Sequence, residues 1–205
     1  MIFLFKMFEY TEEEAGQLIK LARESIKHSF YGERYMIPNG KKFMQARGVF
    51  ITLNSFPSGK LRGCIGFPYA SFPIGKAVAD AAKSAAFSDL RFPQLEEKEL
   101  DKITIELSIL SGMEKLTKKN VNQEIVIGKH GLVCKYITYS GLLLPQVATE
   151  YKMDSFQFLE AVCEKAGLPK DIWQNDKCEI FKFSAQVFKE EQPNGKVVEE
   201  ELHSL

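Results

Sequence analysis

Residues 103–109 carry the most regular hydrophobic pattern in the chain, and this pattern restricts the fold more than any other feature. Isoleucine or leucine occupies every second position, and Thr104, Glu106 and Ser108 stand between them. Side chains of a β-strand point alternately to its two faces, so the segment predicts a strand with one buried and one polar face. Such a strand is typical of an antiparallel sheet that is covered on one side only.

The other patterned segments mix strands with helices. Thr11 and Glu14 form a capping box, and apolar residues then recur at helical spacing as far as Gly32. Small apolar residues recur at the same spacing over 74–86, which lets a second helix lie close to a sheet. Further elements are predicted over 48–53, 61–66, 125–127, 132–134, 145–150, 154–166 and 179–188. Because no regular strand–helix–strand alternation is present, we expect an α+β fold with a largely antiparallel sheet flanked by helices.

The length of the chain suits one domain. Its 205 residues suffice for one core, or for two small lobes that share one, so we expect a single domain over 1–189. The position of any boundary between two lobes stays open. Residues 190–205 are rich in glutamate and contain an Asn194-Gly195 turn, so they predict a mobile acidic tail.

Charge and composition weigh against several functional classes. The 27 basic residues equal the 27 acidic ones, so no global positive field favours nucleic-acid binding. No apolar run approaches the ~20 residues that span a bilayer, and residues 1–8 lead into no cleavage site for export. With four scattered cysteines and three histidines, ligands for a metal are few. We therefore expect a reduced cytoplasmic protein with no metal site, and composition identifies no cofactor.

Residues 61–66 (LRGCIG) are the most chemically dense segment, with two glycines, a guanidinium and a thiol. A loop containing proline and glycine separates them from 48–53, so we expect a hairpin whose second arm is the hexapeptide. On an extended strand Arg62 and Cys64 share one face, and the positive charge favours the thiolate. Gly63 and Gly66 let a ligand or another backbone approach closely. The alternative stays open that Cys64 is a small buried hydrophobic residue and that the glycines mark a bulge.

Polar residues elsewhere are further candidates for a site. In the shaped loop at 87–93, Asp89 and Arg91 either pair with each other or one of them faces Cys64. Between two apolar runs, the sequence GKHG at 128–131 predicts a tight hairpin turn that exposes His130.

A short helix that begins at Pro145 brings two more polar side chains together. Gln146 and Glu150 stand four residues apart, so they share one face of this helix.

Five segments, taken in order, carry a resemblance to a known family: 48–53, 61–66, 89–95, 130–132 and 142–148. Together they resemble the AMMECR domain family, named after the human Alport-syndrome contiguous-deletion region, and LRGCIG is its signature. The resemblance runs from about residue 10 to the last strand, and lysine and glutamate usage is similar to that of archaeal members. The sequence departs from the family at two places. Leu90 stands where a proline or a small residue is common, and residues 152–153 stand where a tryptophan is common.

The resemblance implies an α+β fold of two unequal lobes with a cleft near the signature strand. It supplies no reaction, because the activity of the family is not established. Members occur beside or fused to Memo-like proteins, sometimes with a radical-SAM protein, so the resemblance implies a pathway link to both.

Three hypotheses for function follow. In the first, Cys64 is a nucleophile whose pKa is lowered by Arg62, with His130 as base and Glu150 or Asp89 orienting the imidazole.

In the second, the protein is a non-catalytic binding module. Arg47, Arg62 and Arg91 form an anion pocket for a phosphate, a carboxylate or an acidic protein segment, with Cys64 as a packing residue. The third, a nucleic-acid-associated factor, has the least support, since net charge is zero and no aromatic RNA-binding signature is present.

We favour a ligand-binding cleft centred on Arg62 and Cys64, with thiol-based catalysis as an added possibility. The candidate catalytic residues are Cys64, His130 and Glu150. The candidate ligand-binding residues are Arg47, Arg62, Gly63, Gly66, Asp89, Arg91 and Gln146. The ligand is an unidentified small molecule or an acidic protein segment.

Overall fold

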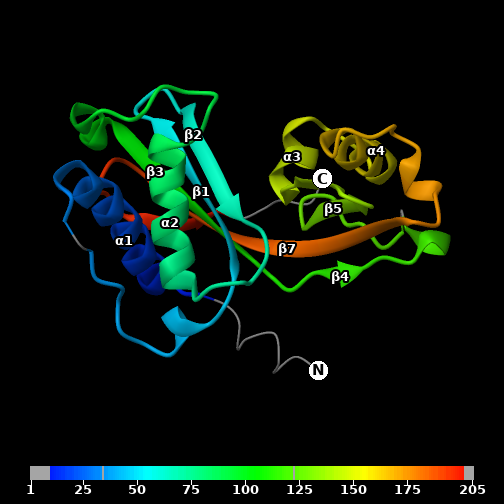
Figure 1. Ribbon diagram of the computed structural model, residues 1–205, viewed down its shortest axis with the longest axis horizontal. Helices are drawn as coiled ribbons and strands as arrows, with labels where there is room; N and C mark the ends of the chain where they lie inside the picture. The colour runs from blue at the N-terminus through cyan, green and yellow to red at the C-terminus, as the bar shows by residue number, and fades with distance from the viewer. Residues whose placement is uncertain (1–9, 34, 122, 201–205) are drawn as a thin grey trace. The chain divides into compact units, whose positions relative to one another are not determined.

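The computed structural model describes residues 10–33, 35–121 and 123–200. The chain forms two compact units. Unit 1 comprises Met1–Leu110 with Gln186–Glu200, and unit 2 comprises Ser111–Ala185 with Glu201–Leu205. Helices and antiparallel strands occur in both (Figure 1), which confirms the α+β prediction.

Unit 1 is built on the strands β1 (Gly48–Ser55), β2 (Lys60–Phe67) and β3 (Ile103–Leu110) in the order β2-β1-β3. β1 pairs antiparallel with both neighbours, which confirms the predicted hairpin and the period-2 strand. Helices α1 (Glu12–Tyr31) and α2 (Ile74–Phe87) pack on one face of these strands (Figure 1). The 3-10 turns η2 (Lys42–Met44) and η3 (Glu97–Lys102) lie in the loops.

The two helices of unit 1 follow their local signals. The predicted capping box at the start of α1 is present, and Gly32 ends the helix in a left-handed conformation. The alanines of α2 allow a close approach to β2, since a Cβ on Gly63 would lie 2.2 Å from the carbonyl oxygen of Ala85. A glycine at position 63 is therefore a packing requirement of this helix–strand contact.

The C-terminal segment of unit 1 differs from our expectation. Strand β7 (Cys178–Glu190) ends at Glu190 and pairs with β8 (Val197–Glu200), so residues 190–200 belong to the fold instead of forming a mobile tail. The reason is a buried ion pair: Arg23 donates to Glu190, and the same carboxylate accepts from the Ile105 amide at 2.9 Å. Residues 201–205 of the predicted tail lie outside the described residues.

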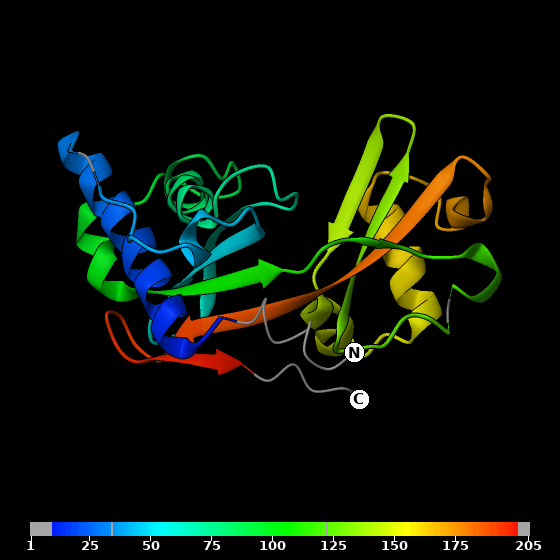
Figure 2. The ribbon, with the colours of Figure 1, turned by 90° about the horizontal axis from the view of Figure 1, so that it is seen from below.

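In unit 2 the strands follow the order β6-β5-β7-β4 with antiparallel pairing, and β7 contributes its first residues. The yellow-green hairpin in Figure 2 is β5 with β6, and α4 is the longer yellow helix. The elements of this unit are β4 (Glu114–Lys115), η4 (Lys118–Asn120), β5 (His130–Tyr136), β6 (Tyr139–Leu143), α3 (Pro145–Glu150), α4 (Ser155–Lys165) and η5 (Ile172–Gln174). Its core is formed mainly by α4 against β5 and β6, where Gly141 leaves room for the backbone of Ala166.

One strand prediction in unit 2 is wrong. Residues 125–127 form turns and irregular structure, so no hairpin joins them to β5. Instead β5 pairs with β6, which follows it in the chain. Gly128 has a left-handed φ of 80°, and the Val126 amide donates to the His130 ring, so the segment closes on itself as a turn.

Candidate functional site around Cys64

Cys64 lies on β2, at one end of the strand order, directly opposite Thr52 of β1. Thr52 in turn lies opposite Glu106 of β3, so the three residues form a row across the sheet on the face away from α2. The Thr52 hydroxyl donates to the Cys64 Sγ at 3.4 Å. A thiol, a hydroxyl and a carboxylate thus stand side by side on one surface of unit 1.

A second row follows on the same face. Phe50 lies opposite Gly66 on one side and opposite Ser108 on the other. A Cβ on Gly66 would lie 2.4 Å from the ring of Phe50, so the ring lies over this glycine. The Ser108 hydroxyl is buried, and within the described chain its oxygen has no hydrogen-bond partner. We call these residues the Cys64 face: Phe50, Thr52, Cys64, Gly66, Glu106 and Ser108.

Arg62 does not belong to this face. The register of the hairpin shifts between Leu53 and Asn54, which pair with Gly63 and Leu61, and the bulge leaves Arg62 without an opposite residue. Bulges re-aim side chains in this way. The Arg62 guanidinium donates to both oxygens of Glu99 at 2.8 and 3.0 Å.

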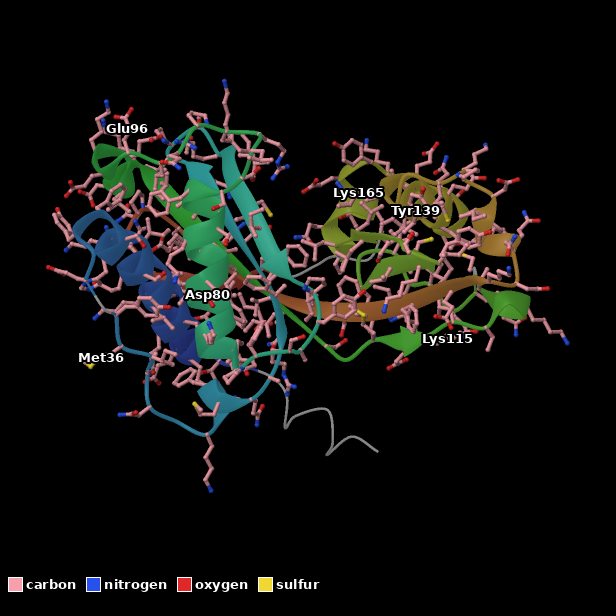
Figure 3. The ribbon with its side chains drawn as sticks, in the orientation of Figure 1. Met36, Asp80, Glu96, Lys115, Tyr139 and Lys165 are labelled. Atoms are coloured by element: carbon pink, nitrogen blue, oxygen red, sulfur yellow. The ribbon has the colours of Figure 1, made fainter. Side chains whose placement is uncertain are left out.

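The remaining donors of Arg62 hold the loop that precedes η3. They reach the carbonyl oxygens of Pro93 at 2.9 Å and Gln94 at 3.3 Å. A capping box between Glu96 and Glu99 starts η3 at this point, and Figure 3 labels Glu96. The expectation that Arg62 sits beside the thiol is therefore wrong. Its charge pairs with Glu99, and its other hydrogen bonds hold the loop that precedes η3.

Asp89 and Arg91 hold the backbone of Cys64 from outside the sheet. The Cys64 amide donates to Asp89 Oδ2 at 2.9 Å, and Arg91 Nη2 donates to the Cys64 carbonyl at 3.2 Å. Arg91 also donates to Asp89 through Nη2 at 2.7 Å and Nε at 2.9 Å. Among the described residues β2 ends the strand order, and the Asp89–Arg91 pair satisfies the outward-facing peptide groups of Cys64.

The ionisation of these groups follows from their surroundings. Burial raises the pKa of the Cys64 thiol, the Thr52 hydrogen bond and the Arg91 charge oppose that rise, and Glu106 and Asp89 add to it. Hydrogen bonds from Arg91 hold the pKa of Asp89 far below its usual range. Cys64 is thus a protonated thiol at neutral pH, against the expectation of a thiolate.

The three arginines of the predicted anion pocket each have hydrogen-bond partners within unit 1. Arg47 stands one residue before the start of β1. Its guanidinium donates to the Ala46 carbonyl and to Gln45 Oε1. Arg62 and Arg91 each pair with a carboxylate. Joint binding of an anion by Arg47, Arg62 and Arg91 stays a prediction.

The other predicted site residues belong to unit 2. His130 begins β5, and its Nδ1 accepts a hydrogen bond from the Val126 amide at 3.0 Å, which leaves the ring proton on Nε2. Burial, followed by the charges of Lys182 and Lys129, lowers the pKa of His130, so the imidazole is neutral at pH 7. A role for His130 as base to Cys64 stays a prediction.

The helix α3 carries the last two candidates. Gln146 is half-buried, and its Oε1 is buried without a hydrogen-bond partner among the described residues. Glu150 is exposed at the C-terminal end of the same helix. Their catalytic and binding roles also stay predictions.

Two searches of the described residues bear on ligands and location. No group of three or more potential metal-ligating side chains comes together there. In that same part of the chain, none of the helices has both the length and the apolar character needed to cross a bilayer.

A model of the AMMECR1 family matches residues 19–188 of the chain. The chain belongs to the AMMECR1 family. This confirms the resemblance that the five ordered segments indicate. The matched region includes the Cys64 face and also His130, Gln146 and Glu150 of unit 2.

AMMECR1 relatives of similar length occur in archaea. A protein of Methanopyrus kandleri is 43% identical over 198 residues, which cover 94% of this chain and 96% of the relative. A protein of Methanocaldococcus jannaschii is 40% identical over 196 residues, with coverage of 94% and 98%. The crystal structure of an uncharacterized protein from Pyrococcus horikoshii has a TM-score of 0.85 at 37% identity, covering 90% of this chain and 95% of that one.

Three residues that shape this AMMECR1 site were not singled out from the sequence. Thr52 and Glu106 stand in the same cross-strand row as Cys64, and Glu99 accepts hydrogen bonds from Arg62. A signal for Glu106 was present, because it occupies a polar position of the alternating segment at 103–109. Nothing in the sequence alone pairs that position with Cys64, since the register of two strand pairs decides it.

Proposed function

We propose that this AMMECR1 protein binds a small ligand on the Cys64 face, with Cys64, Thr52 and Glu106 as contact residues. The observation that carries the proposal is the row itself: three different polar groups stand in direct cross-strand register beside a backbone held by the Asp89–Arg91 pair. The centre of the site is thus Cys64, while Arg62 of the same strand holds the loop that precedes η3.

Rigidity supports a binding role. Side chains on paired strands lose little freedom when a ligand binds, and fixed polar groups gain affinity by this preorganisation. Cys64 is held by β1 on one side and by Asp89 and Arg91 on the other, although β2 ends the strand order.

The state of the thiol favours binding over nucleophilic catalysis. A poised nucleophile needs a lowered pKa or an adjacent base, whereas burial raises the pKa of Cys64 and Arg62 is paired elsewhere. A protonated thiol donates one weak hydrogen bond and offers a polarizable surface to a ligand.

The charges near the thiol indicate the class of ligand. The carboxylates of Glu106 and Asp89 both act on the thiol by raising its pKa, and the Arg91 charge opposes them. Carboxylate oxygens near the thiol suit a ligand that bears hydrogen-bond donors or a positive charge, such as an amine.

Disulfide capture on the native protein tests this proposal. Three small disulfides serve as probes: cystamine, 2-hydroxyethyl disulfide and 3,3′-dithiodipropionate, which are cationic, neutral and anionic. Cys64 thiolate attacks one sulfur of the probe, forms a mixed disulfide and releases the corresponding thiol. Intact-mass and peptide analysis should show capture at Cys64 in the order cationic, neutral, anionic, while the three buried cysteines stay unmodified.

Glu106→Gln should reduce the difference in capture yield between the cationic and anionic probes, because it removes the carboxylate charge of the row. Glu13→Gln, at an exposed position of α1, is the matched control and should leave the order unchanged. Equal capture of all three probes, or capture only after unfolding, would overturn the proposal.

A further inference from the structure

Three thiols of unit 2 cluster in its core. Cys134 lies on β5, Cys163 on α4 and Cys178 at the start of β7, and all three are buried. The Sγ atoms of Cys134 and Cys178 are 3.6 Å apart, and Cys163 hydrogen-bonds to Cys134. A separation of 3.6 Å is van der Waals contact between sulfurs, and ~2.05 Å is the length of a disulfide bond.

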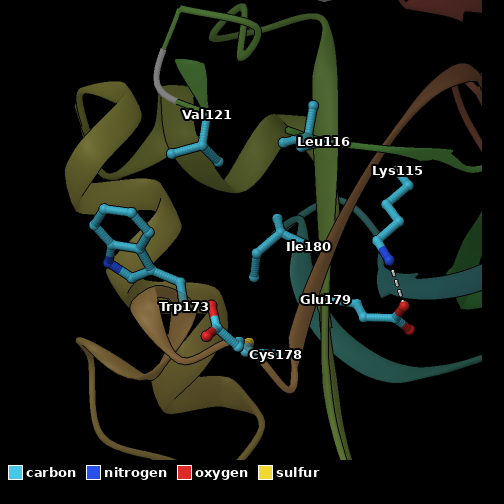
Figure 4. A pocket seen from close by; sticks show the side chains of 8 residues that line it. Lys115, Leu116, Val121, Trp173, Cys178, Glu179 and Ile180 are labelled. Carbon is cyan, nitrogen blue, oxygen red and sulfur yellow. Dashed lines mark hydrogen bonds and ion pairs between the residues drawn. The ribbon is translucent and has the colours of Figure 1, made fainter. Parts of the chain in front are cut away.

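A small cavity of about 70 Å³ is lined in part by one of these cysteines, Cys178 (Figure 4). Ile180 and Trp173 also line it, together with the Lys115–Glu179 ion pair and exposed Asp176. A water needs roughly 10–15 Å³ on the same measure, so the cavity accommodates a molecule of a few heavy atoms. Charged side chains and a cysteine in the lining suit a small polar oxidant.

We propose that Cys134 and Cys178 form an oxidisable dithiol whose substrate is a small peroxide that enters through this cavity. Cys178 gives up its proton as its sulfur attacks one oxygen of hydrogen peroxide and the O–O bond breaks. Cys178 becomes a sulfenic acid, and the departing hydroxide takes up that proton and leaves as water. The Cys134 sulfur then attacks the Cys178 sulfur and the S–O bond breaks. The departing hydroxide takes the Cys134 proton and leaves as water, so a disulfide forms. Altogether two thiols lose two electrons and two protons, and one peroxide becomes two waters.

The order of the two steps follows from the geometry. Cys178 lines the cavity, whereas Cys134 is not among its lining residues. The hydrogen bond with Cys163, followed by burial, strongly raises the pKa of Cys134, so this thiol stays protonated and acts second.

The bond that results is readily reduced. Cys134 lies opposite Ile180, and Cys178 lies opposite Tyr136, so the two cysteines are diagonal neighbours on β5 and β7. Diagonal Cα atoms are typically about 7–8 Å apart, at or beyond the span of an unstrained disulfide, so closure must draw the strands together. Strained disulfides are more oxidising than structural ones and are labile to thiols.

The test is oxidation of the native full-length protein with hydrogen peroxide, followed by non-reducing peptide mapping. We expect a peptide pair linked through Cys134 and Cys178 that dithiothreitol reverses. Trp173, the single tryptophan of the chain, also lines the cavity and should report the change by its fluorescence. A Cys134–Cys178 link that appears only in denaturant, or oxidation that reaches Cys64 alone, would overturn the proposal.

Variants separate the roles. In Cys134→Ala the link should be lost and Cys178 should be trapped by dimedone as a sulfenic acid, whereas Cys178→Ala should remove peroxide reactivity from unit 2. Cys163→Ala is the matched control, because it removes a buried thiol outside the cavity lining and should still form the link. If an alanine variant does not fold, the mapping of the wild-type protein still decides between the outcomes.

Discussion

The carboxylate of Asp89 accepts the backbone amide of Cys64 at 2.9 Å, across 25 positions of sequence. Asp89 is buried, and its charge is balanced by Arg91, which also holds the carbonyl of Cys64. At Cys64 of β2, the two charged residues therefore make the backbone hydrogen bonds that a neighbouring strand would otherwise make. The first two predictions test this relationship.

Asp89→Asn keeps the size of the side chain and removes its charge. Because the charge-assisted bonds to Arg91 and to the Cys64 amide weaken in a buried place, we expect a loss of about 1–3 kcal/mol in the free energy of unfolding. Urea denaturation measures it. Asp80→Asn, which breaks ion pairs on the surface of α2, is the control and should cost about 0.2–1 kcal/mol. Equal losses in the two variants would contradict the assignment.

The contribution of Asp89 should depend on pH. Since its pKa is lower in the folded than in the unfolded chain, the stabilisation is complete above the unfolded pKa of ~3.9 and disappears as pH falls through the folded pKa. Unfolding free energies of wild type and Asp89→Asn should therefore differ at neutral pH and converge in acid. A difference that is constant with pH would show that the charge of Asp89 is not responsible.

Alkylation of Cys64 tests the state of the thiol. Its rate on native protein, followed by peptide mass spectrometry, should reach half-maximum above the ~8.5 pKa of a free thiol. Arg91→Ala should move the profile to still higher pH, because the Arg91 charge lowers this pKa. Arg62→Ala should leave the profile unchanged, since its guanidinium faces Glu99. A profile centred below neutral pH would restore the nucleophile hypothesis.

Gly63→Ala tests the contact between α2 and β2. The added Cβ would lie 2.2 Å from a backbone oxygen of Ala85, which cannot move without shifting the helix, so we expect a loss of more than about 2 kcal/mol. Gly16→Ala, inside α1 with open space around the new methyl group, should instead stabilise the protein by roughly 0.5–1 kcal/mol. Thermal and urea unfolding of both variants provide the comparison.

Local signals predicted much of the fold. The alternation at 103–109, the capping box at Thr11 and the small residues of α2 each act over a few neighbouring positions, and each element formed as expected. Where local signals conflicted with tertiary contacts, prediction failed: residues 125–127 have the composition of a strand but find no partner to pair with. Glu190 lies in an acidic segment, yet Arg23 draws it into the core.

The sequence by itself determined the family, the α+β class, the hairpin and the position of Cys64 on its second strand. Only the tertiary structure decided which groups meet the thiol. A bulge turns Arg62 toward Glu99, strand register brings Thr52 and Glu106 into line, and the loop at Asp89 folds back on the edge of β2. Propensity and periodicity act between near neighbours, whereas these contacts join residues 12 to 54 positions apart, and their geometry exists only once the strands have paired.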